Sequence, residues 1–182
     1  SAAQIGVLTS AQVGALPTAD LAVLTTAQVM ALSTDALAGL TTGQIAALTV
    51  TQIAAITTTQ LGALSTEQIE AIEVADIKAL TTAQAAALTS TQAAALTSTQ
   101  IQALETGDLR ALSTTALAAM GTDQIVALTT AQVASLTVTQ VASLTSEQIA
   151  SIQTADIKAP TAAQAAALTS LQAAALTPDQ IA

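Results

Sequence analysis

Large aliphatic residues recur along the chain at every eighth position. The series begins at Leu8 and ends at Leu176, and it changes in kind only at Met120, which is still apolar, and at Pro160. Counted from this residue, each eight-residue repeat, here termed an octad, reads approximately Leu-Thr-x-x-Gln-Ile-x-Ala, as in residues 40–47. A short fixed period is the signature of a repeat architecture, so the pattern predicts one small structural unit stacked along the chain.

The fifth position of the octad is the most restricted polar position. It occurs 23 times between Gln4 and Gln180 and is Gln 17 times, Asp 4 times and Ala twice. The exceptions are Asp20, Asp76, Asp108, Asp156, Ala36 and Ala116. A polar residue at so regular a position indicates a structural role.

The spacing of the second and fifth positions matches a helix-capping signal. Ser or Thr followed three residues later by Gln forms a capping box, in which the hydroxyl accepts the N3 amide and the Gln side chain accepts the N-cap amide. The Leu before the cap and the Ile or Val after the Gln then form a hydrophobic staple. The predicted capping pairs include Thr41 with Gln44, Thr49 with Gln52, Thr129 with Gln132 and Thr177 with Gln180. Each octad is therefore predicted to begin a new, very short helix.

Two other folds compete with this interpretation. A continuous helix is disfavoured because eight residues at ~100° each return ~80° out of phase, so the Leu row would spiral around the helix. A β-solenoid, which also uses short Thr-rich repeats, stays the alternative, although Ala-rich segments such as residues 85–87 disfavour strands. The predicted fold is an all-α solenoid with one helix per octad, because helices this short gain stability only by stacking.

A longer repeat overlies the octads. Residues 82–96 match residues 162–176 except at two positions, which indicates that a block of 80 residues, or ten octads, was duplicated. The blocks span about 24–103 and 104–182, and we expect one continuous solenoid over residues 1–182 with no separate domains. Ten octads suit coils of two or five octads better than coils of three.

The two ends of the sequence resemble its middle. Solenoids normally close their core with atypical polar repeats, and neither end carries one. We therefore expect that the array continues into further repeats, or that its ends stack on other copies of the chain.

The composition excludes most kinds of site chemistry. The chain has no Cys, His, Trp, Tyr or Phe and a formal net charge of −9. Without thiol or imidazole we expect no enzymatic activity and no cofactor. Lys78, Arg110 and Lys158 are the three basic residues, too few for a nucleic-acid surface. No apolar run approaches the ~18 residues of a membrane span, and residues 1–5 do not resemble a signal peptide.

One acidic cluster could in principle bind calcium. Glu67, Glu70, Glu73 and Asp76 are three residues apart, but the second block retains acidic residues only at Glu147 and Asp156 of the equivalent positions. A solvated acidic face explains this cluster better, so no metal site is predicted.

The third position of the octad is mostly Thr or Ser without a local structural reason. Its members include Thr26, Thr34, Thr42, Thr58, Thr66 and Thr82. We expect this row to face solvent, where it could bind a carbohydrate, ice or another repeat, or carry O-glycans. Plain hydration of a weakly charged surface is the simpler explanation.

Octads such as residues 128–134 (Leu-Thr-Thr-Ala-Gln-Val-Ala) and 136–142 resemble the Leu-Thr-Thr-x-Gln arrays of long bacterial secreted or surface proteins, often labelled adhesion or haem-utilisation proteins. The resemblance implies an extracellular or cell-surface location and a structural or adhesive role. Only two Met side chains could ligate haem iron here. We therefore expect a non-enzymatic stalk, spacer or building block of a surface assembly or filament, with end-to-end self-association. The alternative is a module that binds carbohydrate or ice through its Thr face.

Overall fold

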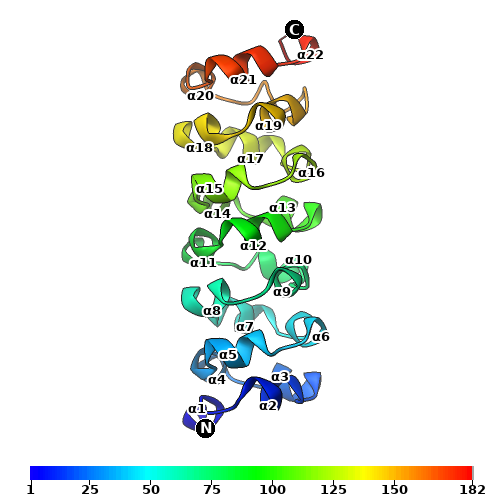
Figure 1. The fold of residues 1–182 in the computed structure, drawn as a ribbon, viewed down its shortest axis with the longest axis vertical. Coiled ribbons are helices and arrows are strands. Elements are labelled where there is room, and N and C mark those ends of the chain that lie inside the picture. The colour runs from blue at the N-terminus through cyan, green and yellow to red at the C-terminus, as the bar shows by residue number, and fades with distance from the viewer. Residues whose placement is uncertain (182) are drawn as a thin grey trace. The chain divides into compact units, whose positions relative to one another are not determined.

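The computed structural model describes residues 1–181, and these residues form 22 short α-helices and no strand (Figure 1). The predicted all-α solenoid of very short helices is therefore confirmed. The helices are α1 (Ala2–Ile5), α2 (Ser10–Gly14), α3 (Thr18–Ala22), α4 (Thr26–Ala31), α5 (Thr34–Ala38), α6 (Thr42–Ala46), α7 (Val50–Ala55), α8 (Thr58–Gly62), α9 (Thr66–Glu70), α10 (Val74–Ile77), α11 (Thr82–Ala87), α12 (Ser90–Ala95), α13 (Ser98–Ala103), α14 (Thr106–Ala111), α15 (Thr114–Ala118), α16 (Thr122–Val126), α17 (Thr130–Ser135), α18 (Val138–Ser143), α19 (Ser146–Ser151), α20 (Ala162–Ala166), α21 (Ser170–Ala175) and α22 (Pro178–Ile181).

Successive helices are connected by two residues in extended conformation, preceded after some helices by one residue in helical conformation, such as Ala47 after α6. Leu96 ends α12 at φ −61° and ψ 133°, and Thr97 precedes α13 at φ −70° and ψ 159°. No residue in the described part of the chain has a positive φ, so these connections do not depend on glycine. The Leu-Thr pair that carries the capping signal is thus also the turn between successive helices.

Octad 152–159 is the exception to this regularity, because it forms turns where its duplicate, octad 72–79, forms α10. In the first copy the amide of Leu80 donates to the carbonyl of Ile77 at 3.2 Å. Pro160 occupies the position equivalent to Leu80, has no amide hydrogen to donate and disfavours helical backbone at the residue before it. One helix is lost there as a result.

Helices that pack against each other lie three octads apart. In the first part of the chain α2 contacts α5, α4 contacts α7 and α8 contacts α11. In the second part α12 contacts α15 and α14 contacts α17. Side-chain hydrogen bonds described below reach back 28 and 31 residues, a distance between three and four octads. One coil therefore takes between three and four octads, and the expectation of two or five octads per coil is wrong.

The packing of Cα atoms divides the chain into two compact units, Ser1–Leu88 and Thr89–Ala182. Each unit has its own aliphatic core, built from the first and sixth positions of the octads, with Ile53 and Leu61 fully buried in the first and Ile101 and Leu117 in the second. The boundary does not coincide with that of the duplicated blocks. A single continuous solenoid over residues 1–182 stays a prediction. None of the helices in residues 1–181 has the length and apolar character needed to cross a membrane.

Candidate functional site

The capping pairs bind each other in both directions. The amide of Gln44 donates to Thr41 Oγ1 at 3.2 Å, and the amide of Thr41 donates to Gln44 Oε1 at 2.8 Å. The other predicted pairs, Thr49 with Gln52, Thr129 with Gln132 and Thr177 with Gln180, form the same two bonds. The side-chain carbonyl of each Gln is therefore used within its own octad.

From Gln44 onward, the side-chain amides of the fifth-position glutamines bind an earlier part of the chain. Gln44 Nε2 donates to the carbonyl oxygens of Val13, at 3.1 Å, and Leu16, at 2.8 Å, which lie 31 and 28 residues earlier. The same two offsets recur at Gln52, Gln60, Gln68, Gln84, Gln124, Gln132, Gln140, Gln148, Gln172 and Gln180. We call this set of bonds the glutamine ladder.

The glutamine ladder provides hydrogen-bond donors for backbone carbonyls that lack partners within a very short helix. The last four carbonyls of any helix lack partners within that helix, and in a helix of five or six residues these are most of its carbonyls. Gln44 and Gln52 are buried, at 3% and 2% exposed. Each donates to one carbonyl of an earlier helix, Val13 or Leu21, and to the carbonyl of the leucine in the connection that follows that helix, Leu16 or Leu24. One bond of this kind stabilises by about 0.5–1.5 kcal/mol, and leaving buried carbonyls unpaired costs more.

The second bond of the Gln side chain was not anticipated from the sequence, although a signal for it exists. Glu serves as well as Gln in a capping box, because that role needs only an acceptor. Glu nevertheless occupies none of the 23 fifth positions. The exclusion of Glu indicates that the position needs a hydrogen-bond donor as well as an acceptor.

Three of the four aspartates at the fifth position are buried, although an ionised carboxylate has no hydrogen to donate; they are Asp76, Asp108 and Asp156. Asp76 is 2% exposed, and its Oδ2 has no hydrogen-bond partner. Burial raises the pKa of Asp76, and the nearby carboxylate of Glu73 raises it further. Asp156, also buried, accepts a bond from Thr130 Oγ1. In all four Asp octads the second position is neither Ser nor Thr, so the capping pair changes as a unit; the residues there are Pro17, Glu73, Glu105 and Gln153.

The acidic cluster does not converge on one point. Glu67, Glu70 and Glu73 are exposed, whereas Asp76 is buried. Hydrogen bonds from the Glu67 amide, Ser65 and the neighbouring threonine lower the pKa of Glu67, which fits a hydrated carboxylate at a helix start. Among residues 1–181 no three acidic side chains are grouped closely enough to hold a metal ion.

The threonines of the third position divide into separate columns. Thr34, Thr58 and Thr82 begin α5, α8 and α11, which pack in succession. Thr42 and Thr66 begin the packed pair α6 and α9. Thr26, Thr42, Thr58 and Thr82 are exposed and the other two are half-buried. The structure therefore brings at most three of them into one column, and binding through this row stays a prediction.

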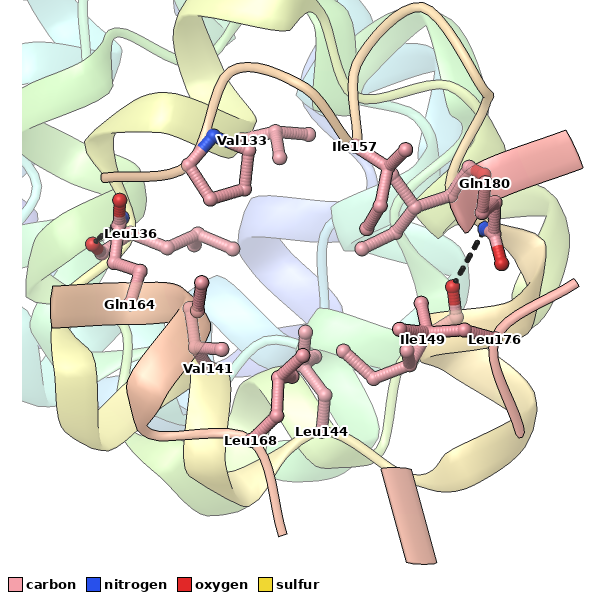
Figure 2. A pocket seen from close by; sticks show the side chains of 13 residues that line it. Val133, Leu136, Val141, Leu144, Ile149, Ile157, Gln164, Leu168, Leu176 and Gln180 are labelled. Atoms are coloured by element: carbon pink, nitrogen blue, oxygen red, sulfur yellow. Dashed lines mark hydrogen bonds between the residues drawn. The ribbon is translucent and has the colours of Figure 1, made fainter. Parts of the chain in front are cut away.

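One cavity of about 150 Å³ lies in the second unit, beside the octad that lacks a helix (Figure 2). Its wall is mainly aliphatic, with Val141, Leu144 and Ile157 among the side chains around it. Two glutamines, Gln164 and Gln180, also line it, but both belong to amide–carbonyl contacts of the ladder type, such as Gln180 Nε2 to the Ile149 carbonyl at 3.0 Å. Because these two side-chain amides already donate to backbone carbonyls, the wall offers few polar groups for chemistry.

Comparison with known proteins gives a family for this fold. The family described as the ALTTAQ repeat matches residues 13–50, 69–106 and 101–138, which together make up more than half of the chain. The hexapeptide of that description stands unchanged at residues 79–84 and 127–132. No curated protein and no solved structure matched the chain. The chain belongs to the ALTTAQ repeat family.

Proposed function

We propose that this chain is a non-enzymatic structural segment, a stalk, spacer or building block of an extracellular surface assembly. The glutamine ladder is the observation that carries the proposal. Because glutamines such as Gln44 and Gln140 bind carbonyls 28 and 31 residues earlier, successive coils are attached by the same kind of bond. An array of this kind can be lengthened by duplication without redesign, as the 80-residue repeat indicates.

The buried polar groups support a structural role over a catalytic one. The side-chain amides of the buried glutamines donate hydrogen bonds to backbone carbonyls, and the capping hydroxyls accept hydrogen bonds from helix amides. A nucleophile would need an activating base, and the chain has neither His nor Cys to form such a pair. The polar chemistry of the interior is thus used to hold the coils together.

The extracellular part of the proposal rests on the resemblance to Leu-Thr-Thr-x-Gln arrays of bacterial surface proteins. It is tested with antibodies raised against the purified chain and applied to intact cells of the source organism. We expect binding to intact cells that disappears after brief treatment with external protease, with a cytoplasmic protein as the unaffected control. Binding that requires permeabilised cells would contradict the surface location.

A binding module that uses its threonines is the second candidate. It is favoured by the exposure of Thr58 and Thr82, which begin the packed helices α8 and α11. A glycan array and a thermal-hysteresis assay on the purified chain test it, with the double variant Thr58→Val and Thr82→Val as the control. A signal that the variant loses would favour binding over a purely structural role.

A further inference from the structure

The second copy of the duplicated block leaves space in its core that the first copy fills. Three residues around the cavity of the second unit are smaller than their counterparts in the first copy; Val133, Val141 and Pro160 stand in place of Ile53, Leu61 and Leu80. Ile53 and Leu61 are fully buried. Loss of buried methylene groups leaves a cavity wherever the surrounding structure does not collapse. The cavity therefore follows from substitutions within the duplicated sequence.

A polar groove of about 340 Å³ adjoins this cavity. Leu136 and Gln164 line both spaces and form one wall of the cavity, and Gln164 Nε2 donates to the Leu136 carbonyl (Figure 2). The groove borders the end of α17, whose counterpart in the first copy, α7, is in contact with α10. Octad 152–159 forms no helix in the place of α10, so α17 lacks the neighbour that covers α7. Cavity and groove are thus adjacent and separated by two side chains.

Arg110 supplies an unpaired positive charge to the groove. Its backbone is held by Gln140 Nε2, which donates to the Arg110 carbonyl at 3.2 Å. The residue is exposed, and its guanidinium has no hydrogen-bond or ion-pair partner within residues 1–181. Thr161, in the same groove, accepts the Gln164 amide through Oγ1 at 3.3 Å, and in the described part of the chain its hydroxyl hydrogen is not used. The groove thus offers a cation and a free donor, which together suit an anion.

We propose that the second unit binds a small amphiphilic carboxylate, with its apolar end in the cavity and its carboxylate at Arg110 and Thr161. A guanidinium group forms paired hydrogen bonds with a carboxylate. An apolar cavity of about 150 Å³ holds a group the size of a benzene ring. Met30 is the counterpart of Arg110 in the first copy, so the cation and the smaller core residues occur together in the second copy. This binding site goes beyond the proposed structural role and does not depend on it.

The test uses phenylbutyrate, whose phenyl ring fits the cavity and whose short chain reaches toward the groove. Because the protein has no aromatic residue, every ring-current shift in its methyl NMR signals comes from the bound ligand. We expect saturable shifts at the cavity methyl groups of Val141, Leu144 and Ile157. The equivalent core residues of the first unit, such as Leu61, should not shift.

Filling the cavity tests the apolar half of the site. The double variant Val133→Ile and Val141→Leu restores the residues of the first copy and should weaken phenylbutyrate binding at least ~10-fold, because the ring loses its space. Val29→Ile adds a methylene group at a fully buried site in the first unit and should bind as the unaltered chain does. Circular dichroism confirms that each variant is folded. Ala165→Ile, at the cavity wall, replaces the double variant if that variant does not fold.

Removing the charge tests the polar half of the site. Phenylbutanol has the same ring and chain without the carboxylate, so the unaltered protein should bind phenylbutyrate about 3-fold more tightly than phenylbutanol, the size expected for an exposed ion pair. Arg110→Met, which places the residue of the first copy in the groove, should abolish this preference and leave phenylbutanol binding unchanged. Added salt should reduce the preference in the unaltered protein.

Three results would overturn the site. One is an absence of shifts at the cavity methyl groups up to the solubility limit of phenylbutyrate. Another is equal binding of phenylbutyrate by the unaltered protein and the filled variant. The third is a preference for the carboxylate that is absent from the unaltered protein or that survives Arg110→Met.

Discussion

Residues 82–96 and 162–176 are two copies of almost the same sequence in different surroundings. Both begin helices with the same capping bonds, Thr81 with Gln84 in one and Thr161 with Gln164 in the other. Their glutamines are buried in both copies. The sixth-position alanines differ: Ala85 and Ala93 are fully buried, whereas Ala165 and Ala173 are exposed.

The difference separates what an octad determines by itself from what its neighbours determine. Helix start and capping depend on the octad alone, so they are the same in both copies. The fifth position binds octads that precede it, and both copies have these. The sixth position is covered when octads follow, as they do after Ala85. A solenoid built this way has a direction, with donors facing one end and open apolar positions facing the other.

The largest effect is expected from removing a ladder donor. Gln84→Glu keeps the capping acceptor but places a carboxylate against the carbonyls of Ile53 and Ile56, which Gln84 Nε2 now binds at 2.8 Å each. Because a buried charge is left unpaired, we expect a loss of about 3–5 kcal/mol in the free energy of unfolding. Urea unfolding followed by far-UV circular dichroism measures it.

Gln164→Glu is the matched variant in the second copy. Its Nε2 binds the Ala134 carbonyl at 3.1 Å, so it too binds an earlier coil. We expect a loss similar to that of Gln84→Glu, although the alanines beside the two glutamines differ in burial. A loss at Gln164 much smaller than at Gln84 would show that the ladder needs following octads as well.

The second prediction concerns the sixth position of the octad, where the two copies differ in burial. Ala85→Ile adds a large side chain to a fully buried site and should destabilise by about 2–3 kcal/mol through overpacking. Ala165→Ile adds the same side chain at the wall of the cavity and should stabilise by up to ~1 kcal/mol. Thermal unfolding at a concentration low enough to avoid association compares them. Equal effects at the two sites would mean that burial at the sixth position is set within the octad.

The local structure of each octad was predictable from sequence, and the coil was not. The capping pairs, as at Thr41 and Gln44, predict where helices start because the bonds are short-range. The number of octads per coil depends on the angle between successive helices, which the extended Leu-Thr pair sets through backbone dihedrals that no residue type specifies. The long-range bond of Gln44 was missed for the same reason: without the coil size, no partner could be named. The lost helix before Pro160 had a local signal in that proline.

The third prediction concerns a helix contact that the two copies make differently. In the pair α2 and α5, a Cβ on Gly39 would lie 2.5 Å from Ser10 Cβ and 2.7 Å from the Ser10 carbonyl oxygen. The equivalent pair, α12 and α15, has Ala119 and Ser90 at these positions. Gly39→Ala should therefore destabilise by about 1–2 kcal/mol as the helices move apart, whereas Ala119→Gly, at an exposed site, should change stability by less than ~0.5 kcal/mol. Calorimetric scans of both variants measure these changes. An unchanged unfolding temperature for Gly39→Ala would mean that the contact between α2 and α5 tolerates either residue.

The smallest effect is expected at Asp76, where the ladder lacks a donor. Asp76→Gln supplies the amide that the carbonyls 28 and 31 residues earlier receive in other octads, and it should stabilise by about 1 kcal/mol at neutral pH. Because the pKa of Asp76 is raised on folding, the folded chain binds this proton more tightly than the unfolded chain. The unaltered chain thus gains stability as the pH falls through the raised pKa, and the gain is complete below the ordinary aspartate pKa.

The advantage of Asp76→Gln should therefore shrink on acidification, and unfolding midpoints at neutral and acidic pH measure the change. Asp20→Gln, at an exposed aspartate of the same octad position, is the control and should leave stability unchanged at both pH values when the chain is dilute. An advantage of Asp76→Gln that persists unchanged at acidic pH would mean that protonation of Asp76 does not restore the missing donor. In that case the cost at this octad would come from the shorter side chain and not from its charge.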